Sequence, residues 1–247
     1  MLKSKTILIA GASGSIGQAI AMECAKKHAQ VILGYHGNQS KAEILAEQIK
    51  SQGGQASCLK LNMESASELD QAFEQHKDQL DSLYGLVNAS GINVAGPLIS
   101  LASSDIERQI NVNLTGAIHL TRLACKNMIR KRSGSIVHLG SVSAHRMIRG
   151  HSAYSAAKAG LEGFVKALAA EVAKRQIRVN CVLPGPVMSE MLKQSMDATG
   201  DNPSERVPFN RLITAEEVAK TVRFLLSSDA SGITGAMIPV DGGYLLL

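Results

Sequence analysis

Short apolar runs recur along the chain with helical segments between them. The runs are five or six residues long, which is typical of buried strands. Their alternation with helical segments predicts parallel strands joined by crossover helices. We therefore expect an α/β fold, a doubly wound parallel sheet of about seven strands with helices on both faces. The expected strands are Thr6–Ala10, Gln30–Gly34, Ala56–Leu61, Leu83–Asn88, Ser135–Gly140, Ile177–Val182 and Ala236–Val240.

The length and composition fit one domain. A chain of 247 residues buries a full core, and no change in composition marks a linker, so residues 1–247 are expected to form a single domain. The core must be aliphatic, because aromatic residues are few and tryptophan is absent. Cys24, Cys58, Cys125 and Cys181 are irregularly spaced and match neither a metal site nor a disulfide framework. A reducing cytoplasm is the expected location.

The charge and hydropathy patterns indicate which surroundings the chain meets. The net charge of +5 comes from scattered lysines and arginines, which is typical of a solvated surface and argues against nucleic-acid binding. An acidic partner is compatible with it. No apolar run approaches the roughly 20 residues that span a bilayer, so no membrane insertion is expected.

A glycine-rich turn follows the first expected strand. It reads Gly11-Ala12-Ser13-Gly14-Ser15-Ile16-Gly17, and a helical stretch runs from Gln18 to His28. Glycines at such a turn let the backbone approach a pyrophosphate, which the helix N-terminus stabilises. A plain tight turn has a similar composition, but the position favours a Rossmann-like dinucleotide site. The candidate cofactor-binding residues here are Gly11, Ser13, Gly14, Ser15, Ile16 and Gly17.

The end of the second strand bears on the choice of cofactor. It reads Gly34-Tyr35-His36-Gly37-Asn38, with no acidic residue before Glu43. In such folds a carboxylate here binds the ribose 2′-hydroxyl of NAD and repels a 2′-phosphate, so its absence favours NADP over NAD. His36 and Lys41 are the nearby basic candidates, and a simple polar loop is the alternative.

Two further strand ends offer candidate cofactor contacts. Asn62 and Met63 follow the third strand and suit the flanks of an adenine, although a surface loop explains them equally well. The fourth strand ends in small residues that would let a ribose lie against the backbone, unless they form an ordinary turn. These residues are Asn88, Ala89, Ser90 and Gly91.

Tyr154 and Lys158 carry the candidate chemistry. A spacing of four places both side chains on one helix face, where an ammonium lowers the pKa of a phenol from its ordinary value of about 10. Tyr154 is therefore a candidate acid-base group near neutral pH. Ser141 follows the fifth strand, so its hydroxyl could hold a substrate carbonyl. A close-packed helix produces the same Tyr-x-x-x-Lys pattern by chance, so the context decides between the two readings.

The helices contain further signals. A long helical stretch runs from Ser103 to Lys131, with Ser103-Ser104-Asp105 as its expected N-terminal cap. Asn111 to Gly116 lie within it, and these poor helix formers indicate either a distortion or tolerated polar residues. The Tyr154 helix is expected to continue to about Arg175; its many small residues pack against the sheet or a neighbouring subunit.

The region after the sixth strand is expected to cover the cleft. Pro184-Gly185 follows that strand, and residues 188–210 form a long polar segment that we interpret as a substrate lid. Thr214-Ala215-Glu216-Glu217 then predicts a capping box that opens a helix.

With these residues in view, the chain resembles the short-chain dehydrogenase/reductase family over essentially its whole length, and most of all the 3-oxoacyl-acyl-carrier-protein reductases. The resemblance rests on the order and spacing of the motifs, not on any single motif. These motifs are the glycine turn, Asn88 to Gly91, Asn113, Ser141, Tyr154, Lys158 and Pro184-Gly185.

The resemblance implies a role for each matching residue. Tyr154 would protonate the carbonyl oxygen, Ser141 would orient that carbonyl, and Lys158 would hold the nicotinamide ribose and depress the tyrosine pKa. Asn113 would anchor a water that feeds protons to the lysine. Val187, through its backbone, and Ser189 would hold the carboxamide.

The resemblance also implies partners. It implies NADPH-dependent reduction of a 3-oxoacyl group on acyl carrier protein, in fatty-acid or related polyketide or polyene synthesis. A homo-oligomer, expected to be a tetramer, would pair the Ser103–Lys131 and Tyr154–Arg175 helices across subunits. Arg132 and Arg175 would dock the acidic carrier protein.

The chain departs from the family pattern at four places, and two other functions stay open. Asn88-Ala89-Ser90-Gly91 replaces the usual Asn-Asn-Ala-Gly, which removes one side-chain amide. Ala10 replaces a threonine, Ser15 replaces the middle glycine of the turn, and Gly14 stands where many of these reductases have a basic residue. One alternative is a family member acting on a free alcohol, sugar or small ketone. The other is a nucleotide-binding module without catalysis, against which the intact catalytic residues argue.

Overall fold

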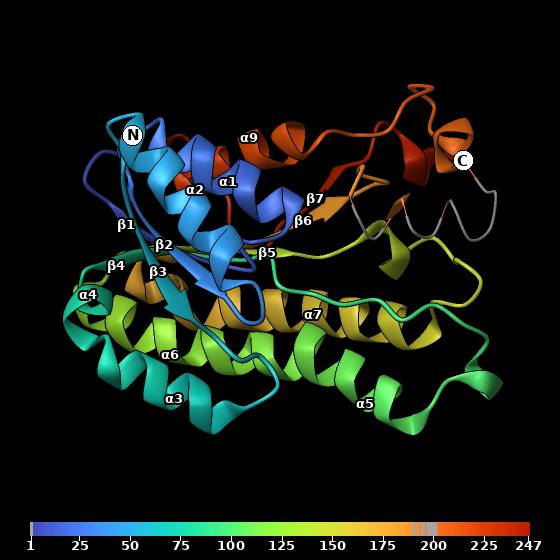
Figure 1. Cartoon of the computed structure of the whole chain (residues 1–247), viewed down its shortest axis with the longest axis horizontal. Coiled ribbons are helices and arrows are strands. Elements are labelled where there is room, and N and C mark those ends of the chain that lie inside the picture. Colours follow the sequence, from blue (N-terminus) through green and yellow to red (C-terminus); the bar gives the residue numbers. More distant parts are fainter. Residues whose placement is uncertain (1, 190–191, 194–195, 197–201) are drawn as a thin grey trace.

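The sheet of this protein is parallel throughout. The computed structural model describes residues 2–189, 192–193, 196 and 202–247, and within these it has a seven-stranded sheet in the order β3-β2-β1-β4-β5-β6-β7 (Figure 1). The predicted doubly wound sheet is confirmed, and the strand ends differ from the predictions by two residues at most. The strands are β1 Thr6–Ala10, β2 Gln30–Tyr35, β3 Gln55–Lys60, β4 Leu83–Asn88, β5 Gly134–Leu139, β6 Ile177–Pro184 and β7 Met237–Val240.

Helices cover both faces of the sheet (Figure 1). One face carries α1 Ser15–Ala25, α2 Gln39–Ser51 and α9 Ala215–Leu226. The other carries α3 Ala66–Gln75, α4 Lys77–Asp81, α5 Ser103–Ile110, α6 Gly116–Lys131 and α7 Ser152–Val172. Each parallel pair of strands needs a crossover connection, and these helices supply it. The strands all end at the edge where α7 begins, and this edge therefore gathers the loops that follow them.

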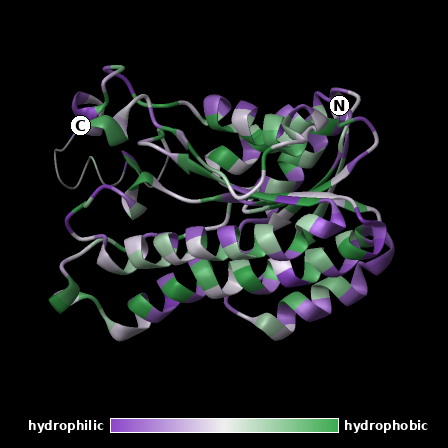
Figure 2. Cartoon of the chain, turned by 180° about the vertical axis from the view of Figure 1, so that it is seen from behind, coloured by the Kyte–Doolittle hydropathy of each residue, from purple (hydrophilic) through white to green (hydrophobic). Residues whose placement is uncertain are grey.

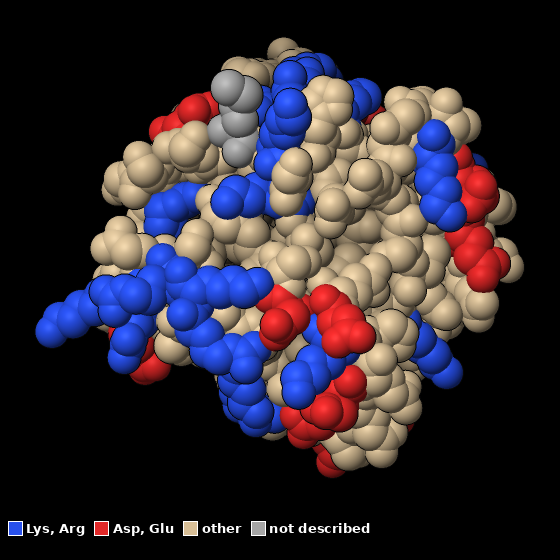
Figure 3. Space-filling model, turned by 90° about the vertical axis from the view of Figure 1, so that its left-hand side faces the viewer, with Lys and Arg blue, Asp and Glu red and all other residues tan. Residues whose placement is uncertain are grey.

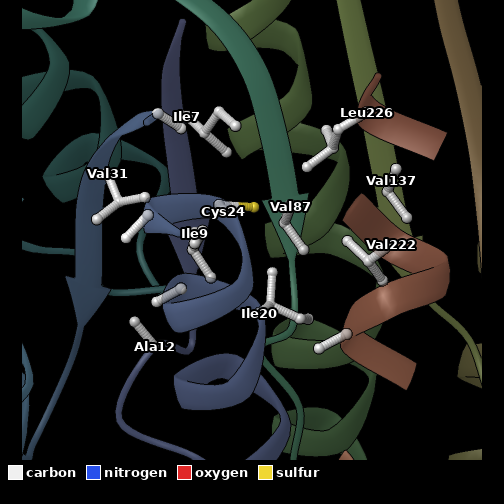
Figure 4. Close-up of a cluster of buried hydrophobic side chains, with 14 of the residues drawn as sticks. Ile7, Ile9, Ala12, Ile20, Cys24, Val31, Val87, Val137, Val222 and Leu226 are labelled. Carbon is white, nitrogen blue, oxygen red and sulfur yellow. The ribbon is translucent and has the colours of Figure 1, made fainter. Parts of the chain in front are cut away.

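Two aliphatic cores fill the spaces between the sheet and the helices. Alternate residues of β1 divide between them: Ile7 and Ile9 belong to the core under α1 and α9, whereas Leu8 and Ala10 belong to the core under α3, α6 and α7. Apolar residues accordingly lie on the inward sides of the helices (Figure 2). Figure 4 shows the first core, where strand residues meet α1 and α9 through Ile7, Ile9, Val87, Val137, Ile20, Cys24, Val222 and Leu226.

The helical stretch before β5 is interrupted, which decides between the two alternatives that the sequence left open for Asn111 to Gly116. Residues Asn111–Thr115 form a π-helical segment between α5 and α6, so Asn111 to Gly116 mark a distortion. A side chain at Gly116 would collide with the main-chain carbonyl of Met63, which explains why glycine is needed at this close approach.

The predicted cap of that stretch is wrong. Ala102 occupies the N-cap position and has no side-chain cap, while Ser103 is already helical. The backbone carbonyl of Ala102 accepts the N–H groups of Asp105 and Ile106, so the turn closes one residue earlier than the serine pattern indicates.

Two other local predictions are confirmed. Thr214 and Glu217 form the reciprocal capping box of α9, with Glu217 N–H donating to Thr214 Oγ1 at 3.2 Å and Thr214 N–H to the Glu217 carboxylate at 2.9 Å. The Tyr154 helix continues through a 3₁₀ turn to Arg175. In the described part of the chain no helix is long and apolar enough to cross a bilayer.

Candidate active site

The loops after β1, β4 and β5 meet at the carboxyl edge of the sheet. Ala89 N–H donates to Ala10 O at 2.9 Å, which ties the loop after β4 to the end of β1. Gly140 N–H donates to Val182 O at 2.8 Å, which ties the end of β5 to β6. The parallel sheet thus brings together residues far apart in sequence, as expected for a ligand site at such an edge.

Ser141, Tyr154 and Lys158 lie together as the sequence predicts. Ser141 follows β5 in an extended conformation and shares a side-chain hydrogen bond with Tyr154. Lys158 is 3% exposed, and its Nζ donates to Leu139 O at 2.8 Å. The same Nζ lies 5.7 Å from the centroid of the Tyr154 ring. A phenol, a hydroxyl and an ammonium therefore share one enclosed site.

The expected effect of the lysine on the tyrosine is not what the structure gives. Burial raises the pKa of Tyr154 above its ordinary value, and the Ser141 hydrogen bond only partly opposes this. The Lys158 ammonium is directed at Leu139 O, so the prediction that it depresses the tyrosine pKa is wrong for this arrangement. Burial instead lowers the pKa of Lys158 to about 8. Tyr154 therefore keeps its proton at neutral pH, as a general acid must.

Asn113 lies in the π-helical segment and holds the loop after β4. Its Nδ2 donates to Ile92 O at 2.8 Å and to Gln109 O at 2.9 Å, and its Oδ1 accepts from Ile92 N–H at 3.2 Å. A Cβ on Gly91 would lie 2.8 Å from Asn113 Oδ1 and 3.5 Å from Lys158 Nζ. Asn113 and Lys158 thus converge on the same stretch of backbone.

The turn after β1 fits a dinucleotide pyrophosphate. Gly11 has φ +78°, and a Cβ there would lie 2.7 Å from the Ala89 backbone, so only glycine allows this approach. The first turn of α1 has neither a side-chain cap nor an acidic residue, which leaves its N–H groups free to bind an anion. A Cβ on Gly14 would meet only Gly11 O, at 3.5 Å, so a larger residue fits there.

Of the residues predicted to contact the adenine and its ribose, some side chains are exposed and others already form hydrogen bonds within the chain. His36 is exposed after β2, and Glu43 lies on α2, where it accepts from Gln39. Asn62 donates to Glu68 and accepts from the backbone of Glu64.

The side chains of two more predicted cofactor residues, Met63 and Asn88, are buried and contact other parts of the chain itself. The Met63 side chain is buried in the core under α6, so only its backbone faces the loop. Asn88 is buried and accepts from Ser90 N–H at 3.2 Å, which shapes the loop that contains Ala89 and Ser90.

The segment after β6 begins beside the site. Gly185 packs against Asp241, where a Cβ would lie 2.7 Å from Asp241 Cα. Val187 is buried and bridges to Ile213, and Ser189 Oγ accepts from Leu192 N–H at 3.1 Å.

The predicted lid is described only in part. Of residues 188–210, positions 190–191, 194–195 and 197–201 lie outside the described residues. Val207 of the remaining part is buried with Val142 and Tyr244, so this end of the segment packs beside the loop that follows Ser141.

The two predicted docking arginines lie together, but far from Tyr154 of the same chain. Arg132 ends α6 with φ 49°, and its Nη2 donates to Lys174 O at 3.0 Å, next to Arg175. Tyr154 is at the opposite end of α7, roughly 27 Å along the axis from Val172, where α7 ends just before Arg175, at 1.5 Å per residue. Basic side chains gather on the amino-edge face of the molecule (Figure 3). Its exposed members include Lys131, Arg132, Lys174 and Arg175.

The structure adds polar residues that the sequence did not single out. Asn93 Nδ2 contacts His151 Nε2 at 3.2 Å, and His151 lies edge-on to Tyr154. His145 Nε2 lies 2.9 Å from both carboxylate oxygens of Glu162, one helical turn beyond Lys158. No sequence pattern singled out these two polar contacts, because they join residues that lie far apart along the chain.

Comparison with known proteins agrees with this geometry. A family model described as enoyl-(acyl carrier protein) reductase matches residues 11–245. The chain is 37% identical over 245 residues to a 3-oxoacyl-[acyl-carrier-protein] reductase of Pseudomonas aeruginosa, covering 99% of both proteins. It is also 37% identical over 243 residues to carbonyl reductase family member 4 of Xenopus laevis, covering 98% of this chain and 99% of the relative.

Solved structures show the same fold. A putative gluconate dehydrogenase from Agrobacterium tumefaciens superposes with a TM-score of 0.93 at 30% identity, covering 100% of this chain and 98% of that one. A short-chain dehydrogenase/reductase from Serratia marcescens gives a TM-score of 0.91 at 31% identity, covering 99% of both. Sequence, fold and the Ser141–Tyr154–Lys158 arrangement agree, and the chain belongs to the short-chain dehydrogenase/reductase family.

Proposed function

We propose that this oxidoreductase uses NADPH to reduce a 3-oxoacyl thioester on acyl carrier protein to the 3-hydroxyacyl form. The observation that carries the proposal is the enclosed Ser141–Tyr154–Lys158 site in a chain 37% identical to a reductase named for that reaction. The bound dinucleotide supplies the hydride.

The proton is the part of the reaction that this chain handles. Tyr154 donates it to the carbonyl oxygen, because burial keeps the phenol protonated at neutral pH. When substrate binds, the single hydroxyl proton of Ser141 turns from Tyr154 to the same carbonyl oxygen and fixes its position. Lys158 lies on the same helix face, and its pKa of about 8 suits exchange of a proton near neutral pH. Asn113 holds the backbone beside that lysine.

NADP is proposed over NAD for this site. The loop after β2 presents His36, and the nearest downstream carboxylate, Glu43, is engaged by Gln39 at 2.7 Å. No carboxylate within the described loop Tyr35–Asn38 would repel a 2′-phosphate. Comparing the KM for NADPH with that for NADH tests this part separately.

The carrier protein is proposed to dock on the basic edge around Arg132 and Arg175. Carrier proteins are acidic, so this edge would steer their approach. Docking there delivers the acyl group to a cleft on another copy of the chain, since the chain's own Tyr154 lies at the other end of α7. The proposal therefore includes a homo-oligomer, and a tetramer is the form that the family resemblance favours.

A second candidate is a reductase of free hydroxyketones or sugars. It is favoured by the 30% identity to a structure described as a putative gluconate dehydrogenase. The test compares NADPH oxidation with a 3-oxoacyl group on carrier protein, the same group on a small thiol, and a sugar ketone. A strong preference for the carrier-bound substrate supports the proposal, whereas preference for the sugar ketone supports the second candidate.

A further inference from the structure

Asn93 and His151 form a polar pair beside the reacting tyrosine. Asn93 Nδ2 lies 3.2 Å from His151 Nε2. The His151 ring meets the Tyr154 ring edge-on, with centroids 5.9 Å apart. His151 is the residue before α7 and stands three positions before Tyr154, a spacing that makes the two side chains neighbours. The pair therefore borders the reacting end of the site without belonging to the catalytic set.

Two buried helix residues fix the backbone on both sides of Asn93. Asn113 makes two hydrogen bonds with the backbone of Ile92, and Gln109 Oε1 accepts from Val94 N–H at 3.1 Å. Asn113 and Gln109 are 0% and 1% exposed. The position of Asn93 is thus set by the same segment that carries Asn113, which argues against a freely moving surface side chain.

The pair leaves hydrogen-bonding capacity unused. Among the described residues, Asn93 Oδ1 and His151 Nδ1 are buried and have no hydrogen-bond partner. Such orphaned buried atoms are costly and need an explanation. If the Asn93 amide N–H donates to His151 Nε2, the imidazole N–H at Nδ1 is a free donor and the amide oxygen a free acceptor. If the amide is turned round and the imidazole takes its other tautomer, the roles exchange, and one donor and one acceptor are again free. Burial lowers the pKa of His151, so the ring is neutral at neutral pH.

We propose that Asn93 and His151 bind a second, neutral oxygen of the substrate, located two carbons from the reacting carbonyl carbon. This rests on the proposed function, in which that oxygen is the thioester carbonyl of a 3-oxoacyl group. A neutral carbonyl or hydroxyl accepts from the free donor of the pair. A carboxylate at the same place would bury a negative charge beside the free acceptor, with a neutral imidazole and a neutral amide as its neighbours, and is disfavoured. The pair therefore selects thioesters and β-hydroxy ketones over simple ketones and free 3-oxo acids.

The two loops that carry the pair touch each other. Gly96 N–H donates to Gly150 O at 3.0 Å, which joins the loop after Asn93 to the residue before His151. Because the free atoms of the pair are buried, the proposed binding requires these loops to part. A substrate oxygen that accepts from the free donor of the pair gives that buried donor a partner, which favours substrates that carry the second oxygen.

The test measures a ratio that does not depend on how much enzyme is folded. Butan-2-one and 4-hydroxybutan-2-one differ by one oxygen at the proposed position, and both are assayed in the same preparation by NADPH oxidation. We expect Asn93→Ala and His151→Leu to lower the kcat/KM ratio of the hydroxyketone to the ketone by about tenfold. His151→Gln keeps a neutral donor and acceptor and should restore most of the ratio. His76→Gln, at the far end of the sheet, is the matched control and should leave it unchanged.

Two outcomes separate this inference from the proposed function. If both substrates decline equally in Asn93→Ala and His151→Leu, the pair is only structural and the inference is overturned, even if the carrier-bound 3-oxoacyl group is still reduced. If the wild-type enzyme fails to reduce the carrier-bound group but the ratio responds as expected, the proposed function fails and the inference stands. The inference would also be overturned if His76→Gln lowered the kcat/KM ratio of the hydroxyketone to the ketone as much as the two test variants do.

Discussion

A methyl group added at Gly91 should damage the site more than its size suggests. A Cβ there would lie 2.8 Å from Asn113 Oδ1 and 3.5 Å from Lys158 Nζ, and real Cβ atoms essentially never approach a neighbour below 3.0 Å. Asn113 cannot easily move aside, because its amide is held by Ile92 and Gln109. Gly91→Ala must therefore displace either the asparagine or the backbone beside the lysine.

The magnitude follows from these contacts. Overpacking of a tight site costs about 1–3 kcal/mol, and each Asn113 hydrogen bond that breaks adds about 1 kcal/mol. We expect a loss of about 2–4 kcal/mol in the free energy of unfolding, measured by urea denaturation, together with a fall in kcat. Gly232→Ala is the matched control, because no atom lies within 4 Å of its added Cβ. If Gly91→Ala matched this control in both stability and kcat, Gly91 would not be needed at the site.

Three more predictions concern the lysine, the basic edge and assembly. Lys158 has a folded-state pKa of about 8 against 10.5 in the unfolded chain, so the unfolded state holds the extra proton between these pH values. The free energy of unfolding of the wild type, measured relative to that of Lys158→Met by urea titration, should therefore rise by about 3 kcal/mol from pH 8 to pH 10.5. A difference that does not change with pH would contradict the lowered pKa of the buried lysine. Arg132→Ala and Arg175→Ala should lower the second-order rate with carrier-bound substrate, more at low salt, while the small-thiol substrate and the Lys220→Ala control hardly change. Equal losses on both substrates would make the arginines structural. Light scattering at micromolar concentration should give a tetramer, and a monomer would count against pairing of α6 and α7 across subunits.

The fold was predictable because its signals are local. Apolar runs and helical segments alternate so regularly that all seven strands were placed within two residues. For Asn111 to Gly116 the sequence left a distortion and tolerated polar residues equally open, and the π-helical segment Asn111–Thr115 shows that the first holds. The predicted cap at Ser103-Ser104-Asp105 was wrong, because the backbone carbonyl of Ala102 closes the turn without any side-chain signal.

The site was predictable only where its geometry is local. Tyr154 and Lys158 share a face because one helix contains both. The direction of the Tyr154 pKa shift was wrong, because burial is a tertiary property that spacing does not reveal. The contact between Asn93 and His151 joins residues 58 positions apart, and only the folded sheet brings them together.

The central claim is that Tyr154 delivers the proton in NADPH-dependent reduction of a carrier-bound 3-oxoacyl group. The most direct measurement compares the rate of NADPH oxidation by the wild type and by Tyr154→Phe, with cofactor affinity determined in parallel. Removing only the hydroxyl should lower turnover on the order of a hundredfold or more while cofactor affinity stays nearly intact. A variant that retains most of its turnover on that substrate would contradict the claim.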